Sequence, residues 1–261
     1  MFRYTKILLT YMKINFKELR SYGVDFYIGS IAMFLKNISN LFLIYIIYNL
    51  VHEINGWNIY EMIYLYSLVT ISFSIWRCFF INTLNITYYV KSGRFDLILT
   101  KPVNPLFLVF MEGFDEDAWG DLAVGIVLYI YVSIILKINI ISIILVFIIA
   151  IVGGLVFSAV SVLGSLISII YVGVSNFSDL PYIIFEFGKY PISIFSPVLI
   201  FIFKTIIPIA WITYIPAIAV LKNNYNIYII FFISIIISLL YFITVSVLWN
   251  ICLNKYSSSG T

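Results

Sequence analysis

Long apolar stretches separated by short polar segments set the pattern of this chain. A helix needs roughly 20 apolar residues to cross the hydrocarbon core of a bilayer. Five stretches meet this requirement and predict membrane-spanning helices, the third of them short; they lie within residues 26–51, 62–84, 119–136, 140–172 and 228–253. The pattern therefore predicts an all-α polytopic membrane protein.

A further apolar stretch, residues 192–220, is interrupted by Pro197, Pro208 and Pro216. It is too long for one comfortable span and too short for two, and proline removes a backbone donor and kinks a helix. Broken helices survive at membrane depth where protein or a cavity covers the backbone. We expect a fifth span over residues 192–207 and a re-entrant segment over residues 208–220, which gives six spans. One long, kinked and tilted helix is the alternative.

The segment 1–22 has the pattern of an interfacial helix. On a helical wheel its basic residues fall within one arc and apolar residues fill most of the remainder. These basic residues are Arg3, Lys6, Lys13, Lys17 and Arg20. We expect this helix to lie on the membrane surface, where its basic face meets acidic lipid or a partner protein. A plain membrane anchor is the alternative.

Composition supports the membrane class. The chain has 261 residues, of which 63% are hydrophobic and 10% charged, whereas soluble domains are about 45–50% apolar and about 25% charged. These values exclude a soluble enzyme and a disordered chain. The net charge of +3 gives no basic field for nucleic acid. Neither His52, the single histidine, nor the distant Cys78 and Cys252 have the spacing of a metal site.

Basic residues also predict the orientation, because they favour the cytoplasmic side of a membrane protein. In the six-span arrangement the side that holds the first segment also carries Lys91, Arg94, Lys101, Lys189 and Lys255. The opposite side carries Lys137 and Lys222. We therefore expect a multi-pass protein of the cell membrane with both termini in the cytoplasm.

The polar segment 85–117 is the longest between two predicted spans. Its first residues continue the second helix until Gly93, and an amphipathic element over residues 95–100 follows. Pro102 and Pro105 end this element. A compact element held between a glycine and two prolines is suited to docking a cytoplasmic partner.

Three short motifs lie after the second span, at the start of the fifth and at the end of the chain. They read Gly93-Arg94-Phe95-Asp96-Leu97-Ile98-Leu99-Thr100-Lys101-Pro102, Lys189-Tyr190-Pro191-Ile192-Ser193-Ile194-Phe195 and Lys255-Tyr256-Ser257-Ser258-Ser259-Gly260. Each resembles a motif of the ABC-2 type transporter permeases, the membrane subunits of bacterial ABC exporters. The order of the predicted segments resembles this family over essentially the whole chain, as a single transmembrane domain of residues 1–261.

The resemblance implies the permease subunit of an ATP-driven exporter. A separate ATPase subunit would bind ATP and Mg²⁺ and dock on the coupling loop and the N-terminal helix. Two permease chains would form the pathway, and a heterodimer is favoured over a homodimer. The chain has no Gly-x-x-x-x-Gly-Lys-Ser/Thr loop, so we expect neither a cofactor in this chain nor an enzymatic activity of its own. The residues expected to couple to the ATPase are Arg94, Phe95, Asp96, Leu97, Ile98, Leu99 and Lys101.

Polar stripes on two predicted spans are candidates for the transport pathway. The second span carries Tyr66, Thr70, Ser74 and Arg77 on one face, and the fifth carries Ser193, Ser196 and Lys204, interrupted by Ile200. The resemblance implies that the second and fifth spans of both chains meet at the centre of the transporter. Hydrogen bonding between neighbouring helices is an equally good explanation of the stripes. For the charged residues within spans, namely Lys36, Arg77 and Lys204, we expect snorkelling to the headgroups or packing.

An acidic cluster lies around the start of the third span. Its members are Glu112, Asp115, Glu116, Asp117 and Asp121. We favour a solvated turn that caps this helix, because carboxylates stabilise a helix N-terminus. A cation site and a contact with a partner remain open.

Two other function classes are open at this point. An ion-coupled secondary transporter needs ionisable residues at mid-membrane, and no acid lies deep within a predicted span. An intramembrane lipid-modifying enzyme needs clustered catalytic side chains, which a single histidine does not favour. The aromatic content of 19% favours an amphipathic or apolar substrate, although aromatics also form interfacial belts.

Overall fold

The computed structural model describes residues 2–21, 23–51, 53–170, 177–222 and 225–256. His52, the side chains of Arg3 and Arg20, and residues 257–260 of the C-terminal motif lie outside this description. Helices make up nearly all of the described ranges, and no strand occurs in them. Five helices are long and apolar enough to cross a membrane, which confirms the all-α polytopic fold. They are α2 (Gly23–Val51), α3 (Ile59–Phe80), α7 (Ala118–Ile135), α8 (Ile140–Ile170) and α12 (Ile227–Leu253).

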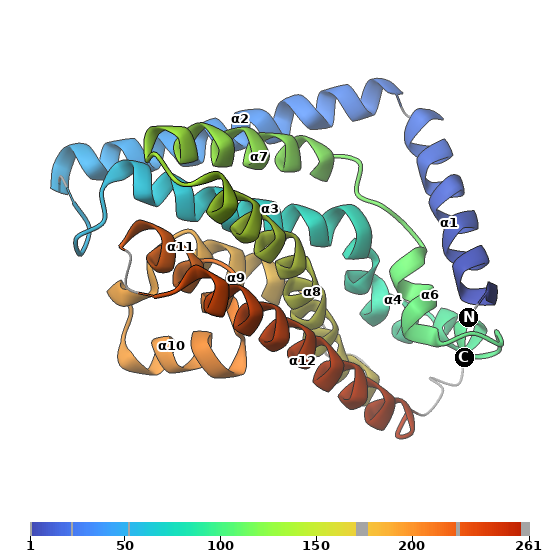
Figure 1. Cartoon of the computed structure of the whole chain (residues 1–261). Helices are drawn as coiled ribbons and strands as arrows, with labels where there is room; N and C mark the ends of the chain where they lie inside the picture. Colours follow the sequence, from blue (N-terminus) through green and yellow to red (C-terminus); the bar gives the residue numbers. More distant parts are fainter. Residues whose placement is uncertain (1, 22, 52, 171–176, 223–224, 257–261) are drawn as a thin grey trace.

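The two ends of the bundle hold different elements (Figure 1). One end, here called the loop end, holds the α2–α3 connection, where Tyr48 donates a hydrogen bond to the carbonyl of Trp57 at 2.9 Å. The other end, here called the α1 end, holds α1 (Phe2–Ser21), η1 (Ile81–Asn85), α4 (Ile86–Lys91), α5 (Arg94–Leu99) and α6 (Pro105–Met111). Helix α1 lies steeply across the direction of α2 (Figure 1), and its Tyr4 packs edge-on against Phe107 of α6. The position of α1 on a membrane surface stays a prediction.

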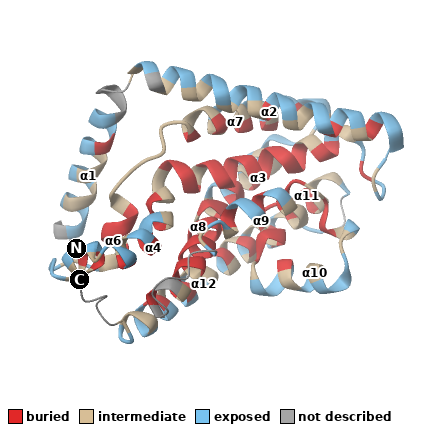
Figure 2. Ribbon diagram, turned by 180° about the vertical axis from the view of Figure 1, so that it is seen from behind, coloured by how far each residue is buried: buried red, intermediate tan, exposed pale blue. Residues whose placement is uncertain are grey.

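Helix α3 is the central element and is buried along most of its length (Figure 2). It begins with a capping box, in which Asn58 and Glu61 each accept a hydrogen bond from the other's backbone N–H. Helix α8 packs closely against α3 because its Gly153 and Gly154 face α3. A Cβ on Gly153 would collide with Ser72, and a Cβ on Gly154 would collide with Ile75. Small residues permit such close contact in lipid, where apolar burial alone does not drive helices together. Helix α2, in contrast, exposes much of its apolar surface (Figure 2).

The proline-containing region differs from the prediction in its boundaries. Residues 192–207 do not form one helix, because the chain breaks on both sides of Ser196 and again at Pro208. The elements of this region are α9 (Leu180–Gly188), η2 (Ile192–Ile194), α10 (Pro197–Phe201), η3 (Ile202–Ile206), η4 (Ile209–Trp211) and α11 (Tyr214–Leu221). The halves Pro197–Ile206 and Ile209–Leu221 meet at an angle of 75°.

Contacts at the loop end show that this bent pair returns to the side from which it starts. Just before the bent pair in the chain, the carbonyl of Ser193 accepts a hydrogen bond from the Asn55 side chain at 3.2 Å. After it, Lys222 Nζ lies 3.0 Å from the carbonyl of Gly56 and 2.7 Å from Glu61. The returning segment therefore begins near Pro197, about ten residues earlier than expected.

Helix α9 begins the passage from the α1 end toward the loop end that was expected of residues 192–207, although its nine residues are too short to span a bilayer alone. Tyr182, near its start, packs against Trp76 at the α1 end of α3. Gly188, at its end, faces Val69, two turns nearer the loop end. Helix α9 thus runs antiparallel to α3, and its sequence escaped detection because residues 180–188 are short and flanked by polar positions.

The close packing of α8 on α3 predicts a large effect of a small substitution. We expect Gly154→Ala to destabilise the protein, because the new methyl group would collide with Ile75. Overpacking of this kind costs about 1–3 kcal/mol, so the midpoint of thermal unfolding should fall by several degrees. Tryptophan fluorescence of the detergent-purified protein measures this change. Gly113→Ala is the matched control, since nothing lies within contact of a Cβ at that position; equal melting of the two variants would contradict the packing.

Candidate functional site

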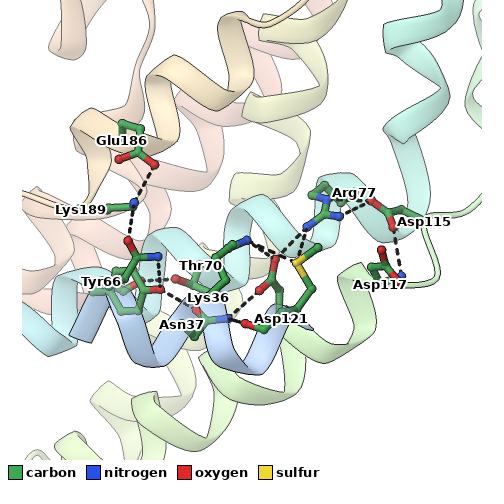
Figure 3. A network of polar contacts seen from close by, with 12 residues as sticks. Lys36, Asn37, Tyr66, Thr70, Arg77, Asp115, Asp117, Asp121, Glu186 and Lys189 are labelled. Carbon is green, nitrogen blue, oxygen red and sulfur yellow. Dashed lines mark hydrogen bonds and ion pairs between the residues drawn. The ribbon is translucent and has the colours of Figure 1, made fainter. Parts of the chain in front are cut away.

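The candidate site is built around the buried guanidinium of Arg77, in the last turn of α3 (Figure 3). Its Nε donates to Asp115 Oδ2 at 2.7 Å, and its Nη1 donates to Asp121 Oδ2 at 2.8 Å. Arg77 is 6% exposed and Asp121 1% exposed. Because an unpaired charge is costly to bury, these two carboxylates are what allow Arg77 to lie inside the bundle.

Asp121 also connects α7 to α2. Its Oδ2 accepts from Lys36 Nζ at 2.8 Å, and its Oδ1 accepts from the side-chain amide of Asn37 at 2.6 Å. Asn37 in turn accepts a hydrogen bond from the hydroxyl of Tyr66 on α3 at 2.5 Å. One carboxylate in the first turn of α7 thereby fixes the positions of three helices relative to one another.

A second chain of contacts reaches α9. Asn40 of α2 donates to the Tyr66 hydroxyl at 3.3 Å and accepts from Lys189 Nζ at 3.2 Å. Lys189 is also paired with Glu186 at 2.6 Å. We call the whole set the polar network; it comprises Lys36, Asn37, Asn40, Tyr66, Arg77, Asp115, Asp121, Glu186 and Lys189. Its three cations and three carboxylates balance in charge.

The polar network forms one side of a cavity between α2 and α9. The cavity has a volume of about 590 Å³, within the usual range for small-molecule sites. Apolar and aromatic side chains line most of it, among them Met33, Phe73, Tyr182 and Phe185. Lys36 and Glu186 line it as well, with side chains 40% and 66% exposed. The cavity is therefore amphipathic.

Within the described ranges, no group of His, Cys, Asp or Glu side chains could hold a metal ion. The site offers ion pairs, hydrogen-bond partners and apolar walls. Such a set can bind and orient a molecule, and it contains no activated nucleophile.

The stripe predicted on the second span lies on a covered face of α3. Tyr66 and Arg77 belong to the polar network, and Thr70 donates to the carbonyl of Tyr66 at 2.7 Å. The Ser74 hydroxyl is buried and makes no hydrogen bond to a described residue. This stripe is thus occupied by contacts with α2 and α7, and Arg77 is its member that reaches the cavity.

The stripe predicted on the fifth span is not assembled. Ser193 is half-buried, whereas Ser196 and Lys204 are exposed. Their predicted common face assumed one helix over residues 192–207, and the break around Ser196 removes that periodicity. The structure therefore does not bring these three residues together with the stripe of α3.

The acidic cluster is more than a solvated cap of α7. Asp115 and Asp121 neutralise Arg77, and Asp117, at the N-cap position, makes no capping hydrogen bond through its side chain. Burial and the nearby Asp115 raise the pKa of the Asp117 carboxyl. Snorkelling or packing was expected for Arg77, and the structure shows packing, with the guanidinium engaged by Asp115 and Asp121. A basic residue at the end of one span, followed by an acid in the first turn of the next, is the sequence signal that could have revealed this pairing.

The predicted coupling element forms α5. It begins directly after Gly93, and Gly93 has a left-handed backbone conformation with φ of 69°. Its two sides differ sharply. Phe95 and Ile98 are buried inside the protein, whereas Leu97 is 66% exposed. Arg94 and Lys101 are also exposed, Leu99 and Asp96 are intermediate, and Asp96 accepts from the Tyr256 hydroxyl at 3.0 Å. The surface left for a partner consists of Arg94, Leu97 and Lys101, here called the coupling surface.

A helical membrane bundle with an amphipathic cavity and a short exposed helix at one end has the architecture of a transport permease. A family model described as ABC-2 family transporter protein matches residues 34–260. The chain belongs to this family and is a membrane permease component of an ABC transporter. Searches of curated proteins and of solved structures gave no significant match.

The buried pairing of Arg77 and Asp121 predicts a strong effect of charge removal. We expect Asp121→Asn to lower the free energy of unfolding by about 3–5 kcal/mol, because the change leaves Lys36 and Arg77 in charge excess inside the bundle. Thermal unfolding of the purified protein and its yield in membranes measure the loss.

A second substitution separates charge balance from side-chain shape. Lys36→Met combined with Asp121→Asn restores the balance, so this double variant should be more stable than Asp121→Asn alone. Glu53→Gln, an exposed acid at the loop end, is the control and should leave stability unchanged. A double variant less stable than either single variant would show that charge balance is not the deciding factor.

Proposed function

We propose that this chain is the membrane-spanning subunit of an ATP-driven ABC exporter that moves amphipathic or apolar molecules out of the cell. The observation that carries the proposal is the coupling surface on α5, an exposed leucine between two exposed basic residues at the α1 end. Because the chain has no phosphate-binding loop of its own, a separate ATPase subunit binds ATP and Mg²⁺. This ATPase docks on α5 and on α1.

The distribution of charge supports a cytoplasmic α1 end. Exposed basic residues at this end are Lys6, Lys13, Lys17, Lys91, Arg94, Lys101 and Lys255, whereas Lys137 and Lys222 lie at the loop end. Lys189 was assigned to the cytoplasmic side from sequence but lies in the polar network. Without Lys189, the basic residues at the α1 end still outnumber those at the loop end. By the preference of basic residues for the cytoplasm, both termini face the ATPase.

The amphipathic cavity supports an amphipathic substrate and a second permease chain. Lys36 and Glu186 would face lipid in a single chain, and charges at membrane depth are costly. A second permease chain packed over α2 and α9 removes them from lipid, and a charge-balanced lining accepts a ligand without leaving an ion unpaired. We favour a heterodimer with a related permease over a homodimer.

Docking predicts a specific sensitivity at Leu97. Burying a leucine is worth roughly 1.5–3 kcal/mol, so Leu97→Ala should weaken ATPase binding by about tenfold to a hundredfold. Co-purification of the co-expressed ATPase with the permease measures this change. Phe95 is a poor test position, because its side chain is buried within the permease itself.

A matched substitution gives the control for docking. Leu50→Ala removes another exposed leucine, at the loop end, and should leave the bound ATPase unchanged. If Leu97→Ala retains the ATPase at normal stoichiometry in high detergent and salt, α5 is not the docking element. Arg94→Ala should weaken binding less, and more visibly at low ionic strength.

Orientation is tested by cysteine labelling. In a Cys252→Ser background, a cysteine at Ser92 should react with an impermeant thiol reagent only after the cell is opened. A cysteine at Glu53 should react in intact cells. Cys78 is buried and can remain. Labelling of the Ser92 position from outside would reverse the orientation.

Oligomeric state is tested by native mass spectrometry of the complex with its ATPase. We expect two permease chains in each complex, because the charged cavity lining is exposed in one. A single permease chain per complex would defeat the two-chain pathway. Two identical chains would defeat only the preference for a heterodimer.

A further inference from the structure

The last residue that the structure describes, Tyr256, packs against α5. Its hydroxyl donates to Asp96 Oδ1 at 3.0 Å. Its ring meets that of Phe95 edge to face, with centroids 5.2 Å apart. Phe95 also meets Trp249 of α12 edge to face, at 5.9 Å. Two side chains of the α12 region thus hold one aromatic side chain of α5 between them.

This contact is buried enough to be rigid. Phe95 and Trp249 are fully buried, and packed side chains in such a cluster have few alternative rotamers. Burial and the adjacent Asp96 raise the pKa of the Tyr256 phenol to about 12. The hydroxyl therefore stays protonated at neutral pH and can donate to the carboxylate.

The backbone connection from α5 to α3 is more flexible than this aromatic contact. Helix α5 follows α4 through Gly93, whose φ of 69° places it in the left-handed region. Glycine adopts this conformation without steric cost and offers no side chain to pack. Changes in the backbone torsion angles of Gly93 would let α5 rotate without moving α4. The packed contact with Tyr256 and Trp249 contains no such flexible residue.

Helix α12 passes any movement on to the bundle. It packs along α8, and α8 packs along α3. On the α3 side, Thr83 of η1 donates a hydrogen bond to Ser161 of α8 at 2.7 Å. Helix α5 also contacts α4 and α6, and α4 packs on α8. The α12–α8 pair is thus a second packed route from α5 to the membrane core, and the rings of Phe95, Trp249 and Tyr256 join it to α5.

We propose that Phe95, Trp249 and Tyr256 form an aromatic clamp that transmits the movement of α5 to the α12–α8 pair, with Tyr256 as a positioning residue for energy coupling. This inference rests on the proposed function, since the ATPase is what moves α5. Docking uses Arg94, Leu97 and Lys101, on the opposite side of α5. Loss of the clamp therefore leaves the ATPase bound but disconnects it from the spans.

The experiment measures movement directly, with spin labels at cysteines introduced at Leu50 and Ile229. Both positions are exposed at the loop end, on α2 and α12, and Cys252→Ser removes the accessible native thiol. The permease is purified with its co-expressed ATPase, and pulsed EPR compares the nucleotide-free complex with the complex trapped by Mg-ATP and vanadate. The wild-type clamp should give a nucleotide-dependent shift in the distance distribution.

Tyr256→Ala should abolish this shift while the ATPase remains bound at wild-type stoichiometry and hydrolyses ATP. Tyr256→Phe keeps the ring contact and loses the hydrogen bond, so a reduced fraction of molecules should shift. Tyr228→Ala is the matched control, because Tyr228 is an exposed tyrosine in the first turn of α12. This variant should show the full nucleotide-dependent shift in distance.

Several results would overturn the clamp. A full shift in Tyr256→Ala, or no shift in the wild-type complex with bound ATPase, would show that α12 does not receive the movement. Loss of the ATPase from both Tyr256 variants would give Tyr256 a role only in placing α5. If the wild-type permease binds no ATPase at all, the proposed function itself fails, which is a separate outcome.

Discussion

Arg77 is a permanent positive charge on a helix that is buried along most of its length, and the need to neutralise it organises the bundle. The penalty for burying one ion is several kcal/mol even after relaxation, so its partners must be held in place. Asp121 and Asp115 provide the opposite charges from α7 and from the segment before it. Since Asp121 also binds Lys36 and Asn37, satisfying one guanidinium fixes the register of α2, α3 and α7 together. The close glycine contacts of α8 then complete the packing around α3.

The five membrane-spanning helices could be predicted from the sequence because hydropathy is a property of each segment by itself. The helix break at Gly93 could also be predicted, since glycine and two prolines act locally. The polar network could not, because Lys36 and Asp121 are 85 residues apart and each is individually compatible with snorkelling or with a solvated cap. The prolines of residues 192–220 marked where the chain breaks, but not which piece crosses. That depended on the contacts of Gly188 with Val69 and of Ser193 with Asn55, which bring distant parts of the chain together.

Charge balance also shapes the cavity between α2 and α9. Each cation of the polar network already has a carboxylate partner, so the cavity needs no counter-ion to be stable when empty. Its exposed members, Lys36 and Glu186, can turn toward a bound polar group without exposing a bare charge to lipid. The apolar walls formed by Phe73 and Phe185 can contact the apolar part of a bound ligand. A lining of this kind favours a molecule with both a polar and an apolar part over one with a net charge, which supports the proposed amphipathic substrate.

Helix α5 has six residues, and the proposed function gives it two tasks, docking and anchoring, which would explain the division of its surface. A helix that used a single apolar side for both docking and anchoring would lose its seat on the bundle whenever the partner bound. Here Phe95 and Ile98 belong to the permease core, while Leu97 points away from it. Substitutions at Phe95 would therefore loosen α5 from α12 and disturb docking at the same time. We expect substitutions at Leu97 to affect docking and those at Tyr256 to affect the anchor. If α5 couples the ATPase to the spans as proposed, the alternation of buried and exposed positions in this short helix separates binding from transmission.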